Sequence, residues 1–66
     1  GAGARGRTFS AVAVAPGTVV SESGMKWCLD EKPLGLLNDL GISNMVESED
    51  AVVSVSSGAI AAFLLR

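Results

Sequence analysis

The most apolar stretch of the chain is residues 51–65, which carry no charged side chain. Ser48 suits a helix N-cap, the two acids that follow it match the positive end of a helix dipole, and Arg66 matches the negative end. A helix over residues 49–66 would be about 27 Å long, close to the roughly 30 Å thickness of a bilayer core. We therefore predict an apolar C-terminal helix over 49–66 that is embedded in a membrane.

Small side chains recur at every fourth position of this predicted helix. Ser54, Gly58 and Ala62 would form a stripe that lets a second helix pack closely, and we assign them to helix packing. The same stretch also fits two strands, because Val53 and Val55 alternate with serines and Gly58 can end the first run. A small chain that contains a β-hairpin and is completed by a partner is therefore the alternative.

A second apolar cluster is rich in leucine. Asp30 suits a helix N-cap, the spacing of Leu36 and Leu40 places both on one helix face, and Gly41 suits a C-cap. This pattern predicts a short amphipathic helix near residues 31–40. Because so short a helix is only marginally stable alone, we expect this surface and the nearby tryptophan to contact a partner. The predicted partner-contact residues are Trp27, Leu36, Leu37, Leu40 and Ile42.

The N-terminal third of the chain is poor in large side chains. Residues 1–6 match the G-x-G-x-x-G spacing of dinucleotide-binding loops, but a β-type run follows them instead of a helix, so we assign no phosphate site there. Residues 8–15 permit a short extended segment, and Pro16 with Gly17 predicts a turn. We predict a flexible, extended arm over 1–23 that bends at this turn, with a hairpin as the alternative.

The charges divide the chain into three zones. All seven acids lie between positions 22 and 50, so the N-terminal arm (1–23) is followed by an acidic segment with the short helix (24–50) and then by the apolar segment (51–66). With an extended arm and two predicted helices, the expected fold class is mostly irregular and α-helical. A chain of 66 residues that is 48% hydrophobic needs a disulfide, a metal or a partner to bury its apolar surface well.

The residue inventory leaves little chemistry to assign. With one cysteine and no histidine, the chain forms no internal disulfide, lacks the usual zinc ligands and cannot assemble a Ser-His-Asp or Cys-His site. Five scattered basic residues and a net charge of −2 disfavour nucleic-acid binding. Cys28 fits best as a small apolar side chain. We predict no enzyme, and no catalytic, cofactor-binding or metal-binding residue.

These expectations point to a small, non-catalytic structural or assembly subunit of a larger membrane-bound complex. The acid-poor start, with alanine, serine and arginine, resembles the composition of transit peptides, so we expect an organellar complex of the photosystem or respiratory type. Its partners would be other protein subunits and membrane lipid, in the thylakoid or the mitochondrial inner membrane. The alternative is a small soluble β-rich module, or a processed chain, that completes a partner's fold.

Overall fold

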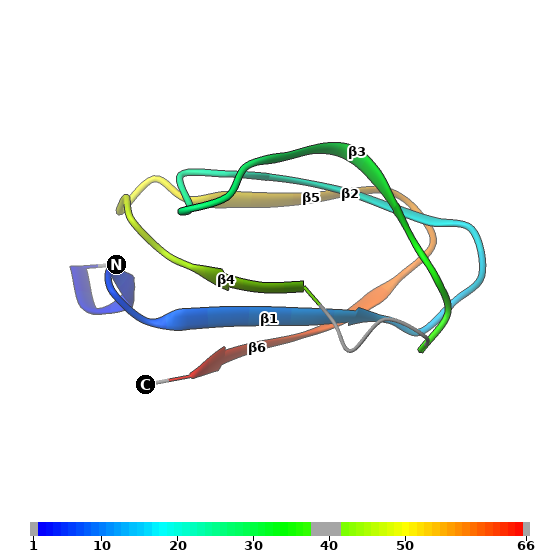
Figure 1. Ribbon diagram of the computed structural model, residues 1–66, viewed down its shortest axis with the longest axis horizontal. Coiled ribbons are helices and arrows are strands. Elements are labelled where there is room, and N and C mark those ends of the chain that lie inside the picture. The colour runs from blue at the N-terminus through cyan, green and yellow to red at the C-terminus, as the bar shows by residue number, and fades with distance from the viewer. Residues whose placement is uncertain (1, 38–41, 66) are drawn as a thin grey trace.

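The computed structural model describes residues 2–37 and 42–65, which form two antiparallel three-stranded β-sheets that face one another (Figure 1). Sheet A has the strand order β4-β1-β6, and sheet B has the order β3-β2-β5. The central strands β1 and β2 therefore belong to different sheets. The elements in chain order are η1 (Ala2–Ala4), β1 (Thr8–Ala13), β2 (Thr18–Ser23), β3 (Leu29–Leu34), β4 (Ile42–Met45), β5 (Val52–Ser57) and β6 (Ile60–Leu65).

The core lies between the two sheets and is built from few side chains. Ala13 of β1, Val20 of β2 and Leu34 of β3 form its buried centre, and Leu29 and Ile60 pack against it. Alanine at the inward position of β1 leaves room for the larger valine and leucine from sheet B. The result is a thin sandwich in which small and large side chains face each other.

Strand β2 shows why this part of the sequence forms a sheet. Thr18, Val20 and Glu22 are buried, whereas Val19 and Ser21 between them are half-buried, which is the period of two expected for a strand. Threonine and valine suit such a surface because their branched side chains pack well on a pleated sheet. The alternation also carries Glu22, a carboxylate, into the interior.

The chain passes from sheet B to sheet A at Gly58. Its φ angle is 78°, and a Cβ atom at this position would come within 2.6 Å of the Thr18 Cα atom. The Thr18 hydroxyl donates to the Ala15 carbonyl oxygen at 2.7 Å and accepts from the Ala59 N–H at 3.1 Å. This buried threonine therefore ties the turn before β2 to the turn between β5 and β6.

The predicted C-terminal helix over 49–66 is wrong, because its described part forms strands β5 and β6. Within residues 2–37 and 42–65, no helix has the length and apolar character needed to cross a membrane. The N-cap and the charges were compatible with a helix, but β5 pairs with β2 and β6 pairs with β1, and this long-range pairing decides the structure. Ser54 lies on β5, Gly58 in the turn and Ala62 on β6, so their four-residue spacing forms no helical stripe.

The predicted short helix near 31–40 is also wrong over its described part. Residues up to Leu34 form β3, which is an edge strand, and there Pro33 is tolerated because a proline needs no ladder donor on the open side. Glu31 has a φ of 50°, which no right-handed helix contains. Leu40 and the predicted C-cap at Gly41 lie outside the described residues.

The N-terminal segment is extended, but it is not an arm. Its two strands, β1 and β2, are the central strands of sheets A and B. The predicted turn at Pro16 and Gly17 is confirmed, and Gly17 has a φ of 70°. The alternative of a hairpin at this turn is wrong, since β1 and β2 do not pair with each other.

Candidate binding site

Three connecting segments meet at the end of the sandwich near the N-terminus (Figure 1). The backbone of Val46 donates to the Arg7 carbonyl oxygen at 3.0 Å and accepts from the Gly6 N–H at 2.8 Å. The Met45 carbonyl oxygen accepts from the Lys26 N–H at 2.8 Å. These bonds fix the segments relative to one another. We call this region the loop end, and it consists of residues 4–7, 24–28 and 44–49.

The side chain of Asn44 connects several parts of the loop end through hydrogen bonds. Its side chain comes from β4 and is only 2% exposed. The Oδ1 atom accepts from the Trp27 N–H at 3.0 Å, and the Nδ2 group donates to the Trp27 carbonyl oxygen. Nδ2 also donates to Glu22 Oε1 at 2.9 Å. One amide therefore holds both backbone polar groups of Trp27 and links β4 of sheet A to β2 of sheet B.

Trp27 presents an exposed aromatic ring on this fixed backbone. The residue is 56% exposed, and the Lys26 ammonium lies 4.8 Å from the ring centroid. That distance places the cation over the aromatic face, where the ring quadrupole attracts positive charge. A large ring that is left in solvent while its backbone is pinned is suited to stacking against a planar or cationic ligand.

Glu22 lies behind this arrangement and is only 2% exposed. Its Oε1 atom accepts from Asn44, whereas Oε2 has no hydrogen-bond partner within residues 2–37 and 42–65. Burial of a carboxylate oxygen without a partner is unfavourable, and native proteins seldom contain one without a reason. The position therefore calls for an explanation beyond packing.

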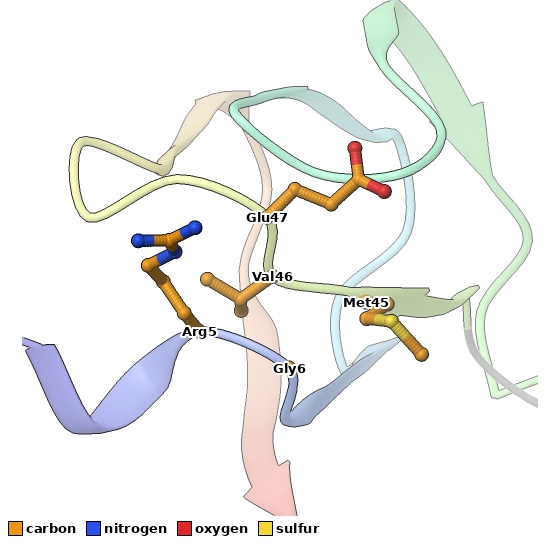
Figure 2. Close-up of a pocket in the computed structure, with 5 residues that line it drawn as sticks. All are labelled: Arg5, Gly6, Met45, Val46 and Glu47. Atoms are coloured by element: carbon orange, nitrogen blue, oxygen red, sulfur yellow. The ribbon is translucent and has the colours of Figure 1, made fainter.

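Two cavities flank Val46 at the loop end. The first, with a volume of about 230 Å³, opens between the sheets and is mostly apolar, with Glu49 and Ser48 among its lining residues. The second is a wider, open hollow of about 630 Å³ that is lined by Arg5, Gly6, Met45, Val46 and Glu47 (Figure 2). The apolar residues that line the first cavity include Phe9, Met25, Val53 and Leu64.

Charged side chains of both signs surround these cavities. Figure 2 shows the Arg5 and Glu47 side chains extending from the hollow in different directions. Glu47, Glu49 and Asp50 are exposed and follow one another closely in the chain, so carboxylates border both the hollow and the apolar cavity. A cation that carries apolar rings would find both kinds of contact here.

The structure separates the residues predicted to contact a partner. Trp27 lies in the loop end, whereas Leu36 and Leu37 are exposed and pair with Ala13, at the end of β1 that is farther from the loop end. Ile42 begins β4, and Leu40 lies outside the described residues. Their assignment to partner contacts stays a prediction.

Sequence reasoning did not identify Asn44 or Glu22. Glu22 occupies an inward position in the alternation of β2, and recognising that strand would have marked it as a buried carboxylate. Nothing local distinguishes Asn44, because three of its four side-chain hydrogen bonds reach residues 17 and 22 positions away, and the fourth is to its neighbour Met45.

One protein family matches the chain over residues 2–60, which run from η1 to the first residue of β6. Its description is "Thiamin pyrophosphokinase, vitamin B1 binding domain". No curated protein and no solved structure matches. The matched family is not one of photosystem or respiratory subunits, so the expectation of a thylakoid or other organellar membrane protein is wrong. Because the match covers well over half of the chain, including five of the six described strands in full, the chain belongs to the family of thiamin pyrophosphokinase vitamin B1 binding domains.

Proposed function

We propose that this chain is the thiamin-binding β-sheet module of a thiamin pyrophosphokinase and that the loop end receives the vitamin. The observation that carries the proposal is Trp27, an exposed ring whose backbone is held at both polar groups by one buried amide. Membership in the family indicates which ligand to consider, and the loop end offers a surface whose chemistry suits that ligand.

Thiamin consists of a permanently cationic thiazolium ring joined to an aminopyrimidine. A planar cation is attracted to the face of a tryptophan, and its interaction grows when water is excluded. Lys26 already occupies one face of the Trp27 ring with a cation, which supports the same use of that ring by a ligand cation. The exposed carboxylates of Glu47 and Glu49 favour the same positive charge.

The apolar cavity beside Val46 suits the uncharged part of such a ligand. Phe9 and Leu64 line it from sheet A, and Val53 lines it from sheet B, so a ring that enters it would lie between the two sheets. Burial of ring surface there gives binding energy, while the carboxylates near the cavity orient the cationic end. This division of roles resembles small-molecule sites in general, which are mostly apolar with a few placed polar groups.

Transfer of a pyrophosphoryl group also needs a site for the phosphate donor. We propose that this module binds the vitamin and that other parts of the enzyme, or a partner chain, bind the donor. This assignment agrees with the alternative drawn from the sequence, a β-rich module that completes a partner's fold. The prediction that the chain itself contributes no catalytic residue stays a prediction.

The chain contains one tryptophan, so its intrinsic fluorescence reports on Trp27 alone. Titration with thiamin is expected to change this fluorescence saturably, and calorimetry is expected to give the same dissociation constant. Choline, which carries the charge without the rings, and cytosine, which carries a ring without the charge, are both expected to bind much more weakly. Absence of any saturable signal with thiamin would overturn the proposal.

Two variants locate the binding surface. Trp27→Ala, followed by calorimetry, is expected to weaken thiamin binding by about tenfold or more, since loss of a stacked aromatic contact is worth about 1–2 kcal/mol. Leu37→Ala changes an exposed apolar residue near the opposite end of the sandwich and is the matched control, with unchanged affinity expected. Equal thiamin affinity of Trp27→Ala and the parent protein would show that thiamin does not bind at the loop end.

A further inference from the structure

We infer that Glu22 and Asn44 are positioning residues that hold Trp27 in its ligand-binding orientation, an inference that rests on the proposed function of the loop end. Glu22 orients the amide of Asn44, and the amide then fixes the Trp27 backbone. Neither residue needs to touch the vitamin. Both are almost fully buried, and their hydrogen bonds run from β2 of sheet B through β4 to the backbone that carries the exposed ring.

The first step is the attachment of Trp27. Asn44 Oδ1 accepts from the Trp27 N–H, and Nδ2 donates to the Trp27 carbonyl oxygen, so the amide satisfies both groups of one residue in a loop. The same Oδ1 atom also accepts from the Met45 N–H at 2.9 Å. A loop residue whose backbone donor and acceptor are both bound to one rigid, buried group keeps its backbone angles, so the direction in which its side chain leaves the chain is fixed.

The second step is the orientation of the amide itself. An asparagine amide presents a donor, Nδ2, on one side and an acceptor, Oδ1, on the other. A flip of the amide would exchange the two atoms and place the Nδ2 donor against the Trp27 N–H, which is also a donor. A carboxylate oxygen only accepts hydrogen bonds, so Glu22 Oε1 selects the orientation in which Nδ2 faces it. This accounts for a carboxylate in the interior, where an apolar side chain would fill the same place without selecting any orientation.

The unpartnered oxygen of Glu22 allows a positioning role to be distinguished from a role in stability. Glu22 Oε2 is buried without a hydrogen bond within the described residues, so replacement of the whole carboxylate by an apolar group removes an unfavourable burial as well as one favourable bond. Glu22→Leu should therefore change the thermal stability little and the order of Trp27 strongly. A residue kept only for stability would show the opposite result.

The experiment measures amide hydrogen exchange at Trp27 and fluorescence anisotropy of its ring in the ligand-free full chain. Glu22→Leu and Asn44→Ser are expected to accelerate exchange of the Trp27 amide and to lower the anisotropy. Glu22→Gln keeps an acceptor oxygen and is expected to restore both values. Glu31→Leu is the matched control, because Glu31 is an exposed glutamate of sheet B that accepts from Ser21 and Ser56 instead.

Thiamin affinity forms the second readout. The loss of one oriented hydrogen-bond clamp is expected to raise the dissociation constant about tenfold in Glu22→Leu and Asn44→Ser, with less than about a twofold change in Glu22→Gln. Unchanged Trp27 exchange in both Glu22→Leu and Asn44→Ser would overturn the inference. If Glu22→Leu does not fold, Asn44→Ser decides alone, since its short hydroxyl side chain cannot bridge both backbone groups of Trp27.

The ligand-free measurements and the thiamin affinities together distinguish the positioning role from the proposed thiamin-binding function. Hydrogen exchange and anisotropy need no ligand, so they decide the positioning role even if the parent protein binds no thiamin. A parent protein that binds thiamin through Trp27, with exchange and affinity unaffected in both variants, would retain the proposed function and reject the positioning role.

Discussion

At the residue scale, Gly17 and Gly58 share a positive φ angle but differ in their surroundings. A Cβ atom at Gly17 would have nothing within 4 Å, whereas one at Gly58 would press on the backbone of Thr18. Gly17→Ala is therefore expected to cost about 1 kcal/mol through its backbone conformation alone. Gly58→Ala adds a clash with backbone that cannot move aside and should cost about 3 kcal/mol or more. Urea unfolding of both variants measures the difference, and equal losses would contradict this account.

Thr18 gives a second prediction at this scale. Thr18→Val keeps the shape of the side chain but leaves the Ala15 carbonyl and the Ala59 N–H without their buried hydroxyl partner. The free energy of unfolding is expected to fall by about 1–3 kcal/mol. Thr8→Val is the control, since Thr8 is only half-buried and no hydrogen bond of its side chain is seen within the described residues. A Thr18 variant as stable as the parent protein would show that the hydroxyl is dispensable.

At the element scale, the sequence predicted the turn at residues 16 and 17 but assigned the C-terminal segment to the wrong element. Proline followed by glycine at 16 and 17 is a local signal, and the turn is there. The C-terminal segment was assigned to a helix because a cap, two acids and a terminal arginine agree with one, yet Val53 and Val55 also show the alternation of a strand. What decides between the two is pairing with β1 and β2, whose residues lie 29 to 57 positions away from their partners, and no local pattern contains such pairing.

The leucine-rich segment allows a direct test of the strand assignment. In β3, Leu34 points into the core, whereas Leu37 beyond the strand is 64% exposed. Leu34→Ala is expected to lower the free energy of unfolding by about 3 kcal/mol, because it leaves a cavity beside Val20. Leu37→Ala should change it by less than about 0.5 kcal/mol. A helix that buried Leu36, Leu37 and Leu40 together would reverse this order, and chemical denaturation separates the two outcomes.

At the scale of the whole molecule, the apolar composition is spread over two regions. The core is small, and large apolar side chains of sheet A, such as Met45, Phe63 and Leu65, remain exposed. Met45 and Leu65 both pair with Thr8, so they share one face of sheet A, away from the buried alanines. The sequence correctly indicated more apolar surface than the chain buries, and contact of that surface with a partner stays a prediction.

The candidate binding site was harder to predict from the sequence than the excess of apolar surface. Trp27 was predicted from the sequence as a partner-contact residue. Its supporting residues were not, since Glu22 and Asn44 meet only after β2 and β4 have been placed in facing sheets. The site therefore depends on the assembled sandwich, and a ligand bound there should stabilise the whole fold.

This coupling gives the last prediction. A ligand that binds only the folded chain stabilises it by about 2.7 kcal/mol at a concentration one hundred times its dissociation constant. For a domain of this size, thiamin at that concentration should raise the Tm by roughly 10 °C or more. Because Trp27→Ala is expected to bind about tenfold more weakly or worse, calorimetric scans of this variant at the same thiamin concentration should show about half that rise or less, while Leu37→Ala should retain the full one. Equal shifts in the parent protein and in Trp27→Ala would place the stabilising site elsewhere on the sandwich, because the ring that is removed would then contribute nothing to the coupling.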